Sequence, residues 1–400
     1  MSEPRRPGLM TPAFLSLSLA VLAYFVADGT TLPVTPLYVA GPLGGDNTSI
    51  GIAIGAFSAT ALILRPFAGR LADTRGRRLM IIIGAALFAV GMIGHLLANT
   101  IPVLVVMRLI LGSGEAFLFV SALAAASDLA PDDRRGEAIS LISLSLYLGI
   151  AVGPFIGEWI LGEDRFAAVW IAAALFALVA VGLALRMPET LSREDRDTAR
   201  SAARDGSAAS TRIIHPGAIV PGLVLLTGAA GMAGFVTFTT RYARDIGLET
   251  SWPVFLLFAA IVLGIRGFAP WLPDRLGHRR AAYVALTFGG LGLVTIAVWA
   301  SPLGLFAGAA VFAFGGSFAF PALAALVTDT VPRAERGAAL GTFSAFLDLA
   351  FGAGPIVLGV VADAAGYGRM FLVAAAMTGV GLIVLRLTRP RDRPALAPAT

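Results

Sequence analysis

Long apolar segments, interrupted by glycine, proline and charged residues, run through the whole sequence. A membrane-spanning helix needs about 20 consecutive, mostly apolar residues, and each segment is long enough to supply them. The segments lie at residues 12–40, 50–72, 79–99, 101–129, 137–161, 165–186, 217–243, 251–273, 280–300, 303–329, 337–363 and 367–387. The pattern predicts an all-α integral membrane protein with twelve transmembrane helices.

The composition supports this class and restricts the chemistry. Of the 400 residues, 57% are hydrophobic and 14% are charged, and the mean hydropathy is +0.82. Every residue in the count of 30 lysines and arginines is an arginine, which excludes a lysine-dependent nucleotide loop and Schiff-base chemistry. There is no cysteine, and the three histidines are too scattered to indicate a metal site. We therefore expect no metal and no cofactor. Any transport must be driven by a gradient, for which we expect a proton gradient, or by another subunit.

Arginine is concentrated in the loops on one side of the predicted membrane. These loops contain Arg75, Arg77, Arg78, Arg134, Arg135, Arg275, Arg279, Arg280, Arg333 and Arg336. The opposite loops contain only Arg165, Arg241, Arg244 and Arg369. The positive-inside rule places the richer side and both termini in the cytoplasm. The basic residues therefore report topology, and we expect no nucleic-acid partner.

An internal repeat relates two parts of the chain at a constant offset of 201 residues. The best-matched stretch pairs Arg65, Phe67, Ala68, Leu71, Asp73, Gly76 and Arg78 with Arg266, Phe268, Ala269, Leu272, Asp274, Gly277 and Arg279. The same offset pairs Asp128 with Asp329 and Pro154 with Pro355. A parallel duplication of this kind predicts two pseudo-symmetric six-helix bundles around a central cavity.

The repeat divides the chain into five parts. We expect a cytoplasmic tail at 1–11, a bundle at 12–186, a cytoplasmic linker at 187–216, a second bundle at 217–387 and a second tail at 388–400. Charges alternate in sign from Arg193 to Asp205 in the linker, which is typical of a solvated surface helix.

The loop after the second predicted helix carries a motif made of Gly69, Asp73, Gly76, Arg77 and Arg78, with a partial copy at Asp274, Gly277 and Arg279. The motif resembles the signature of the major facilitator superfamily, which implies the fold of that family. The resemblance also implies that Asp73 lies against the start of helix eleven, and that Arg77 or Arg78 pairs with Asp128 to latch a cytoplasmic gate. Asp329 takes the place of Asp128 in the repeat. The alternative is a charge cluster that sets topology without gating.

The fifth predicted helix carries a glycine-rich motif at Gly149, Gly153, Pro154 and Gly157. It resembles the antiporter signature of drug:proton exporters in that superfamily, and the chain as a whole looks like the permeases named for arabinose efflux or drug resistance. Small residues at this spacing let helices approach closely, and the proline bends the helix. Ordinary helix packing is the alternative explanation.

Four ionisable residues lie inside predicted spans, where charge is costly and usually functional. They are Asp28, Arg108, Glu115 and Asp348. Arg108, in a segment that resembles an arginine motif of the family, and Glu115 share one face of helix four, about 10 Å apart along its axis. We hypothesise that Asp28, with Glu115 as a second acid, exchanges a proton for cargo while Arg108 stabilises the deprotonated form. The alternative is a permanent bridge from Arg108 to Glu115 or Asp28.

Asp348 allows two interpretations. It either lines the cavity as a contact for cations or satisfies backbone groups freed by the bend at Pro355, and its counterpart in the repeat is Tyr147. Arg65 and Arg266 lie nearer the cytoplasmic helix ends, where we expect gate or interface residues.

The second half is rich in phenylalanine. The candidates for an aromatic cavity wall are Phe235, Phe238, Phe314, Phe318, Phe343 and Phe346, although phenylalanine at helical spacing also serves for packing. One ionisable and one aromatic wall would suit an amphipathic, cationic organic molecule. Two asparagines and no glutamine argue against a sugar carrier.

Together these patterns favour a secondary transporter, not an enzyme, in the inner membrane of a bacterium. We expect proton-coupled export of small organic compounds by a monomer in the lipid bilayer, with the cargo and protons as its partners. A proton-coupled importer that uses the same acids is the first alternative. A membrane enzyme or receptor is the second.

Overall fold

The computed structural model describes residues 9–131, 134–204, 215–268, 275–331 and 335–388, and helices account for most of them. The helices are α1 (Pro12–Ala40), α2 (Asn47–Arg75), α3 (Arg77–Gly94), the short 3-10 helix η1 (His95–Leu97), α4 (Ile101–Leu129), α5 (Arg135–Leu161), α6 (Phe166–Leu185), α7 (Arg193–Arg204), α8 (Pro216–Asp245), α9 (Trp252–Phe268), α11 (His278–Val298), α12 (Pro302–Thr330) and α13 (Arg336–Leu387).

The predicted number of membrane spans is confirmed in the part of the chain that the structure describes. Ten helices are long and apolar enough to cross a membrane. One of them, α13, is broken at Gly366, whose φ of 84° lies outside the helical region, so it contains two spans. The shorter apolar helix α9 supplies the twelfth, and the rest of its predicted span, 269–273, lies outside the described residues.

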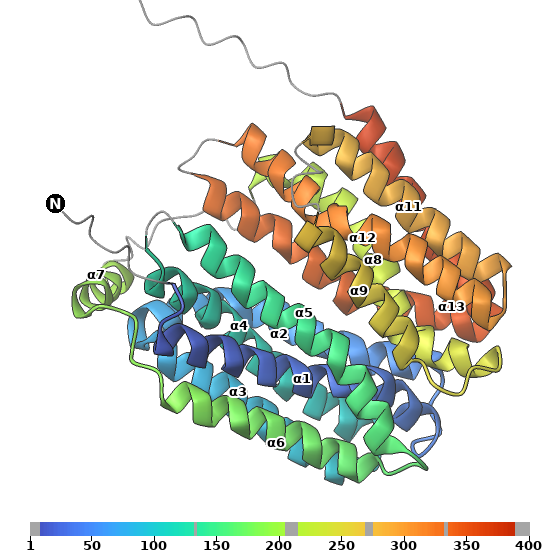
Figure 1. Ribbon diagram of the computed structural model, residues 1–400, viewed down its shortest axis with the longest axis horizontal. Coiled ribbons are helices and arrows are strands. Elements are labelled where there is room, and N and C mark those ends of the chain that lie inside the picture. The colour runs from blue at the N-terminus through green and yellow to red at the C-terminus, as the bar shows by residue number, and fades with distance from the viewer. Residues whose placement is uncertain (1–8, 132–133, 205–214, 269–274, 332–334, 389–400) are drawn as a thin grey trace, which may run out of the picture.

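Two groups of helices form the body of the protein (Figure 1). Helices α1 to α6, blue to green, form the N-terminal half, and α8 to α13, yellow-green to red, form the C-terminal half. Three pairs of helices make the main contacts across the interface: α2 with α13, α5 with α9 and α1 with α8. The linker helix α7 lies against the end of α2.

Local signals in the sequence explain where several helices begin. Thr11 and Asp46 accept hydrogen bonds from backbone N–H groups in the first turns of α1 and α2, and Ser301 does the same for α12. Such caps satisfy N–H groups that have no partner within the helix. Gly76 and Gly277, the repeated motif glycines, have φ values of 120° and 80° at the turns before α3 and α11. A side chain there would be strained, which explains glycine at both positions.

The glycine-rich motif of α5 packs directly on α1. A Cβ added at Gly153 would lie 2.5 Å from the Cα of Gly29, and one added at Gly149 would lie 2.6 Å from the backbone of Phe25. A Cβ at Gly157 would overlap the carbonyl oxygen of Thr30. Because a larger residue would push the two helices apart, these glycines fix the position of the α1 segment that carries Asp28.

Candidate functional site

Arg65 joins the two halves through ion pairs with one acid in each. Its Nη2 lies 3.3 Å from Oε1 of Glu115, on α4 of the same half, and its Nη1 lies 2.8 Å from Oδ2 of Asp348, on α13 of the other half. Both acids are only 7% exposed. A buried ion pair interacts strongly, and removing one partner of such a pair typically costs about 3–5 kcal/mol.

Arg108 and Asp28 extend this cluster into the N-terminal half. Arg108 is 3% exposed, its Nε donates a 3.2 Å hydrogen bond to the carbonyl oxygen of Ala53, and its guanidinium lies 5.0 Å from the centroid of the Phe57 ring. Asp28 is half-buried and lies within electrostatic range of both Arg108 and Glu115. The cluster therefore holds three carboxylates and two guanidinium groups.

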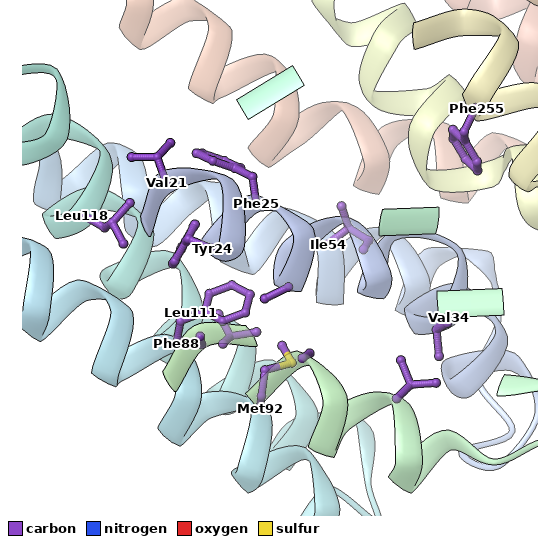
Figure 2. Close-up of a cluster of buried hydrophobic side chains, with 14 of the residues drawn as sticks. Val21, Tyr24, Phe25, Val34, Ile54, Phe88, Met92, Leu111, Leu118 and Phe255 are labelled. Atoms are coloured by element: carbon purple, nitrogen blue, oxygen red, sulfur yellow. The ribbon is translucent and has the colours of Figure 1, made fainter. Parts of the chain in front are cut away.

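Tyr24 places a phenol group beside these charges. Its ring packs among apolar side chains of α1, α3 and α4 in Figure 2, with its centroid 4.6 Å from that of Phe88. Its hydroxyl group, Oε2 of Glu115 and Nη1 of Arg108 are buried and have no hydrogen-bond partner among the described residues. Buried polar atoms are normally paired, so the carboxylate oxygen has capacity for a proton or a hydrogen-bond donor, and the hydroxyl and guanidinium groups have capacity to donate to a polar ligand.

The pairing of these residues includes an arginine, Arg65, that the sequence did not place in the cluster. Arg108 forms no ion pair with Glu115 or Asp28 among the described salt bridges, so the expected permanent bridge is wrong. Glu115 pairs instead with Arg65, because α2 crosses α4 at this depth and brings the arginine inward. Asp348 pairs with the same arginine, a role that neither of its two interpretations from the sequence included.

The repeat contains a second arginine contact at the equivalent position. The Arg266 guanidinium, on α9, lies 4.5 Å from the ring centroid of Tyr147, on α5. Arg266 corresponds to Arg65 and Tyr147 to Asp348 at the offset of 201. Both arginines therefore reach across the interface, one to a carboxylate and one to an aromatic ring. The alignment of the sequence with itself already contained this signal, because it pairs the two arginines with each other and their two partners with each other.

The motif residues lie at one end of the molecule, which we call the arginine-rich end and define by the turns at Gly76 and Gly277. There Arg77 forms an ion pair with Asp128 and lies 3.5 Å from Asp73. Asp128 also accepts a 3.0 Å hydrogen bond from the hydroxyl of Thr190 in the linker. These contacts join parts of the N-terminal half and its linker.

Arg78 and its repeat counterpart Arg279 bind the ends of other helices. Arg78 donates a 2.6 Å hydrogen bond to the carbonyl oxygen of Leu185, and Arg279 donates to the carbonyl oxygens of Leu385 and Thr388. Cations are favoured at helix C-termini, where carbonyl groups lack partners.

The C-terminal copy of the motif has the same internal pairing as the first. His278, which corresponds to Arg77, lies 2.7 Å from Asp329, which corresponds to Asp128. Asp274 lies outside the described residues.

Among the described residues, Asp73 makes no contact with the start of helix eleven, and residues 332–334, just before that helix, lie outside the described part of the chain. The Asp73 side chain is 55% exposed, and its ion pair in the described structure is with Arg77 of its own half. At this end the described ion pairs remain within a half or reach the linker.

The opposite end of the interface is held by two carboxylates, and we call it the clamped end. Glu158, at the end of α5, accepts hydrogen bonds from the backbone N–H groups of Ser251 (3.0 Å) and Trp252 (3.1 Å), where α9 begins. The Ser251 hydroxyl also donates to Glu158. The acid thus caps a helix of the other half.

Asp363 forms the second part of the clamp. It accepts hydrogen bonds from the backbone N–H groups of Asn47 (2.9 Å) and Thr48 (2.8 Å) and from the Thr48 hydroxyl (2.6 Å), where α2 begins. The repeat relates α5 to the first part of α13 and α2 to α9, so the two caps join corresponding pairs of helices, although at the offset of 201 Glu158 corresponds to Gly359 and Asp363 to Gly162. The sequence interpretation missed both roles, and its one relevant signal was an acid, Glu158, directly after the glycine-rich motif.

The predicted aromatic wall is wrong for four of its six residues. Phe235, Phe238, Phe318 and Phe343 are at most 1% exposed, so they fill the interior of the C-terminal half and cannot line an open cavity. Phe235, for example, lies within 6.1 Å of three other phenylalanine rings. Phe314 and Phe346 are half-buried. In the described residues, no three histidine, aspartate or glutamate side chains form a group that could hold a metal ion.

Two bundles of six helices with charged residues buried between them define a class of multi-pass membrane transporters, and comparisons with known proteins identify the family. The family model of the Major Facilitator Superfamily matches residues 17–313 and 268–400. The chain belongs to this superfamily.

An uncharacterized MFS-type transporter of Salmonella typhimurium is 31% identical over 384 residues, which are 93% of this chain and 95% of the relative. One of Burkholderia mallei is 30% identical over 395 residues, 95% of this chain and 93% of the relative.

Solved structures share the fold at low sequence identity. The nucleoside transporter NupG has a TM-score of 0.76 at 16% identity, over 94% of this chain and 98% of its own. The xylose transporter XylE from E. coli, in a partially occluded inward open conformation, has a TM-score of 0.74 at 15% identity, over 95% and 99%. The human organic anion transporter MFSD10 has a TM-score of 0.70 at 20% identity, over 95% and 100%.

Proposed function

We propose that this secondary transporter exports small amphipathic cations from a bacterial cytoplasm in exchange for protons. The observation that carries the proposal is the charge of the buried cluster. Three carboxylates and two guanidinium groups leave one negative charge when all five are ionised. Uncompensated charge is costly in a membrane interior. A proton or a monovalent organic cation would each remove it, so the two compete for the same site, which is the requirement for exchange.

In this proposal the acids of the cluster carry the proton and Arg108 stabilises the deprotonated form. Asp28 and Glu115 are the primary proton carriers, as the sequence suggested, and Asp348 contributes the carboxylate of the other half. The free Oε2 of Glu115 supports this role, since a second carboxylate oxygen without a partner is open to a proton or to a cation. The exporter assignment draws on the resemblance of the α5 glycine motif to the antiporter signature, and the same glycines hold α1, and with it Asp28, in place.

The test measures exchange directly. Purified protein in liposomes would be given a pH gradient and ethidium, an amphipathic monocation, and proton and ethidium movements would be followed with separate fluorescent signals. We expect ethidium movement to drive proton movement in the opposite direction. Asp28→Asn and Glu115→Gln should each abolish this coupling, because neither amide carries a proton in exchange. Glu194→Gln, at an exposed site on α7, is the matched control. Normal coupling in both cluster variants would refute the proposed role of the acids.

The direction of transport has a separate test. For an exporter, loss of the protein should raise the intracellular concentration of ethidium, whereas for an importer it should reduce uptake. A fall in uptake would favour the proton-coupled importer.

The proposal also places the arginine-rich end and both termini in the cytoplasm, by the positive-inside rule. The native sequence lacks cysteine, so a single introduced cysteine can be labelled without background. Glu163→Cys, in the loop before α6 at the clamped end, should react with a membrane-impermeant maleimide in cells whose outer membrane is permeabilised. Asp197→Cys, on α7, should react only after the inner membrane is also opened. The reverse result would invert the topology.

A further inference from the structure

Arg65 contacts one acid in its own half and another across the interface. The Glu115 contact is internal to the N-terminal half, whereas the Asp348 contact crosses to the C-terminal half. Arg65 lies eighteen residues into α2, about 27 Å from the clamped end, so the Asp348 contact is far from the two carboxylate caps. Any change in how Arg65 divides between these acids therefore acts on the interface away from the two caps.

We infer that Arg65 transmits the protonation state of Glu115 to the contact between the two halves. The inference rests on the proposed function, because it assigns a conformational effect to the proton that the cluster binds.

Protonation of one acid changes the relative strength of the two ion pairs that the Arg65 guanidinium makes with Glu115 and Asp348. A charge-assisted hydrogen bond is roughly twice as strong as a neutral one. When Glu115 binds a proton, its hold on Arg65 weakens, and the guanidinium interacts more fully with Asp348. This strengthens the link across the interface and stabilises the conformation described here. When Asp348 binds a proton or a cationic cargo, Arg65 remains with Glu115 and the link is released. The two acids therefore act in opposite directions.

The surroundings of both acids are limited to a few charged or titratable groups. Asp348 has Arg65 on α2 and Glu115 on α4 within electrostatic range. Glu115 has Arg65 on α2, Asp348 on α13, and Asp28 and Tyr24 on α1 within electrostatic range. Arg108, on the same helix as Glu115, interacts with Asp28 and Tyr24. Arg65 is the group that makes an ion pair with both acids. It is a positioning residue, and in this scheme it does not itself carry the proton.

The repeat supplies an internal control for this mechanism. Arg266 makes the equivalent crossing, but its partner is the Tyr147 ring. A cation–π contact has no carboxylate to protonate, and it contributes about 0.5–2 kcal/mol regardless of the protonation of Glu115. Weakening this contact should shift the conformational equilibrium by the same factor at every pH.

The test measures conformation without any cargo or gradient. Ile139→Cys on α5 and Thr330→Cys on α12, both exposed near the arginine-rich end of opposite halves, would carry spin labels in the cysteine-free protein. Pulsed electron spin resonance then gives, between pH 5 and pH 9, the ratio of the arrangement described here to an arrangement in which the two halves approach each other at the arginine-rich end. Glu115→Gln should raise this ratio about tenfold at high pH, and Asp348→Asn should lower it about tenfold, the scale of one charge-assisted hydrogen bond.

Arg65 decides whether these effects share a mechanism. In an Arg65→Gln background, Glu115→Gln should change the ratio less than twofold, and the pH dependence should flatten. Arg266→Gln should shift the ratio but keep its pH dependence. Shifts of the same sign for Glu115→Gln and Asp348→Asn, or effects that persist without Arg65, would overturn the inference. If Arg65→Gln fails to fold, the opposed signs of the two acid variants decide alone. If the two acid variants shift the ratio in opposite directions but ethidium is not exchanged for protons, the proposed function would be rejected and the Arg65 link would stand.

Discussion

The two ends of the interface use similar chemistry with opposite results. At the clamped end, Glu158 and Asp363 bind helix N-termini of the other half. At the arginine-rich end, Asp128 and Asp329 bind Arg77 and His278 of their own halves. Acids are placed at helix ends in both regions. The difference shows that the side on which the partner lies, and not the type of residue, determines which end holds the halves together.

Backbone packing adds to this difference at the clamped end. A Cβ added at Gly51 would overlap the carbonyl oxygen of Pro355, and one added at Gly55 would overlap that of Gly352. These contacts join α2 to α13 over more than one turn. At the arginine-rich end, by contrast, an added Cβ at Gly341 near the start of α13 or at Gly277 would meet nothing within 4 Å.

The largest expected effect comes from forcing this packing apart. Gly51→Leu should separate α2 from α13, because the added side chain meets backbone atoms that cannot move aside. Overpacking of this kind costs about 3 kcal/mol, which corresponds to more than a hundredfold loss of the closed arrangement at this end. Spin labels at Glu163→Cys and Glu249→Cys, on the two halves, measure the separation. Gly182→Leu, on an exposed face of α6 with nothing within 4 Å, is the control, and an equal response there would remove the packing explanation.

Removing the stronger carboxylate cap should have the next largest effect. Glu158→Gln loses the charge that accepts hydrogen bonds from two backbone N–H groups and one hydroxyl group. Bonds to a charged group contribute about 1.5–3 kcal/mol, so the clamped end should open tenfold or more often. The same pair of spin labels reports the change. An unchanged distance distribution would mean that the apolar and glycine contacts hold this end without the cap.

The second cap should contribute less because Asp363 is exposed to water. Asp363→Asn should open the clamped end about threefold, within the range for an exposed charge at a helix N-terminus. Combined with Glu158→Gln, its effect should be close to additive, since the two caps lie on different helix pairs. Strong non-additivity would show that the caps open together as one unit.

The smallest effect is expected at the arginine-rich end. Asp128→Asn should lower the thermal stability of the protein by about 0.5–1 kcal/mol, because it weakens an ion pair near the surface. The distance between spin labels at Ile139→Cys and Thr330→Cys should stay unchanged, because Asp128 and its partner Arg77 both belong to the N-terminal half. A shift in those distances would contradict the distinction between the two ends.

The fold followed from the sequence more completely than the pairing of its charges. Twelve apolar segments and the offset of 201 residues are properties of the chain itself, so the spans and the two bundles could be read directly. The partners of Arg65 could not, because they depend on how α2, α4 and α13 cross in space. Helical rise gave the depth of Glu115 but not the direction from which an arginine reaches it.

The two carboxylate caps at the clamped end could not be predicted from the sequence for a different reason. Glu158 and Asp363 bind mainly backbone N–H groups, which every residue except proline possesses, so no pattern of side chains marks the partner. The phenylalanine prediction failed because helical spacing is the same for a residue facing a cavity and for one buried inside a bundle. The distinction depends on burial, which only the folded structure provides.

The correspondence between Tyr147 and Asp348 has a genetic consequence. Tyrosine and aspartate codons differ only in their first base, so a single point mutation can turn one side chain into the other. A duplicated transporter with two equal arginine contacts could in this way acquire a proton-sensitive contact on one side of the interface only. At this pair of positions, a change of one nucleotide would then distinguish the two contacts, while an arginine is kept on each side.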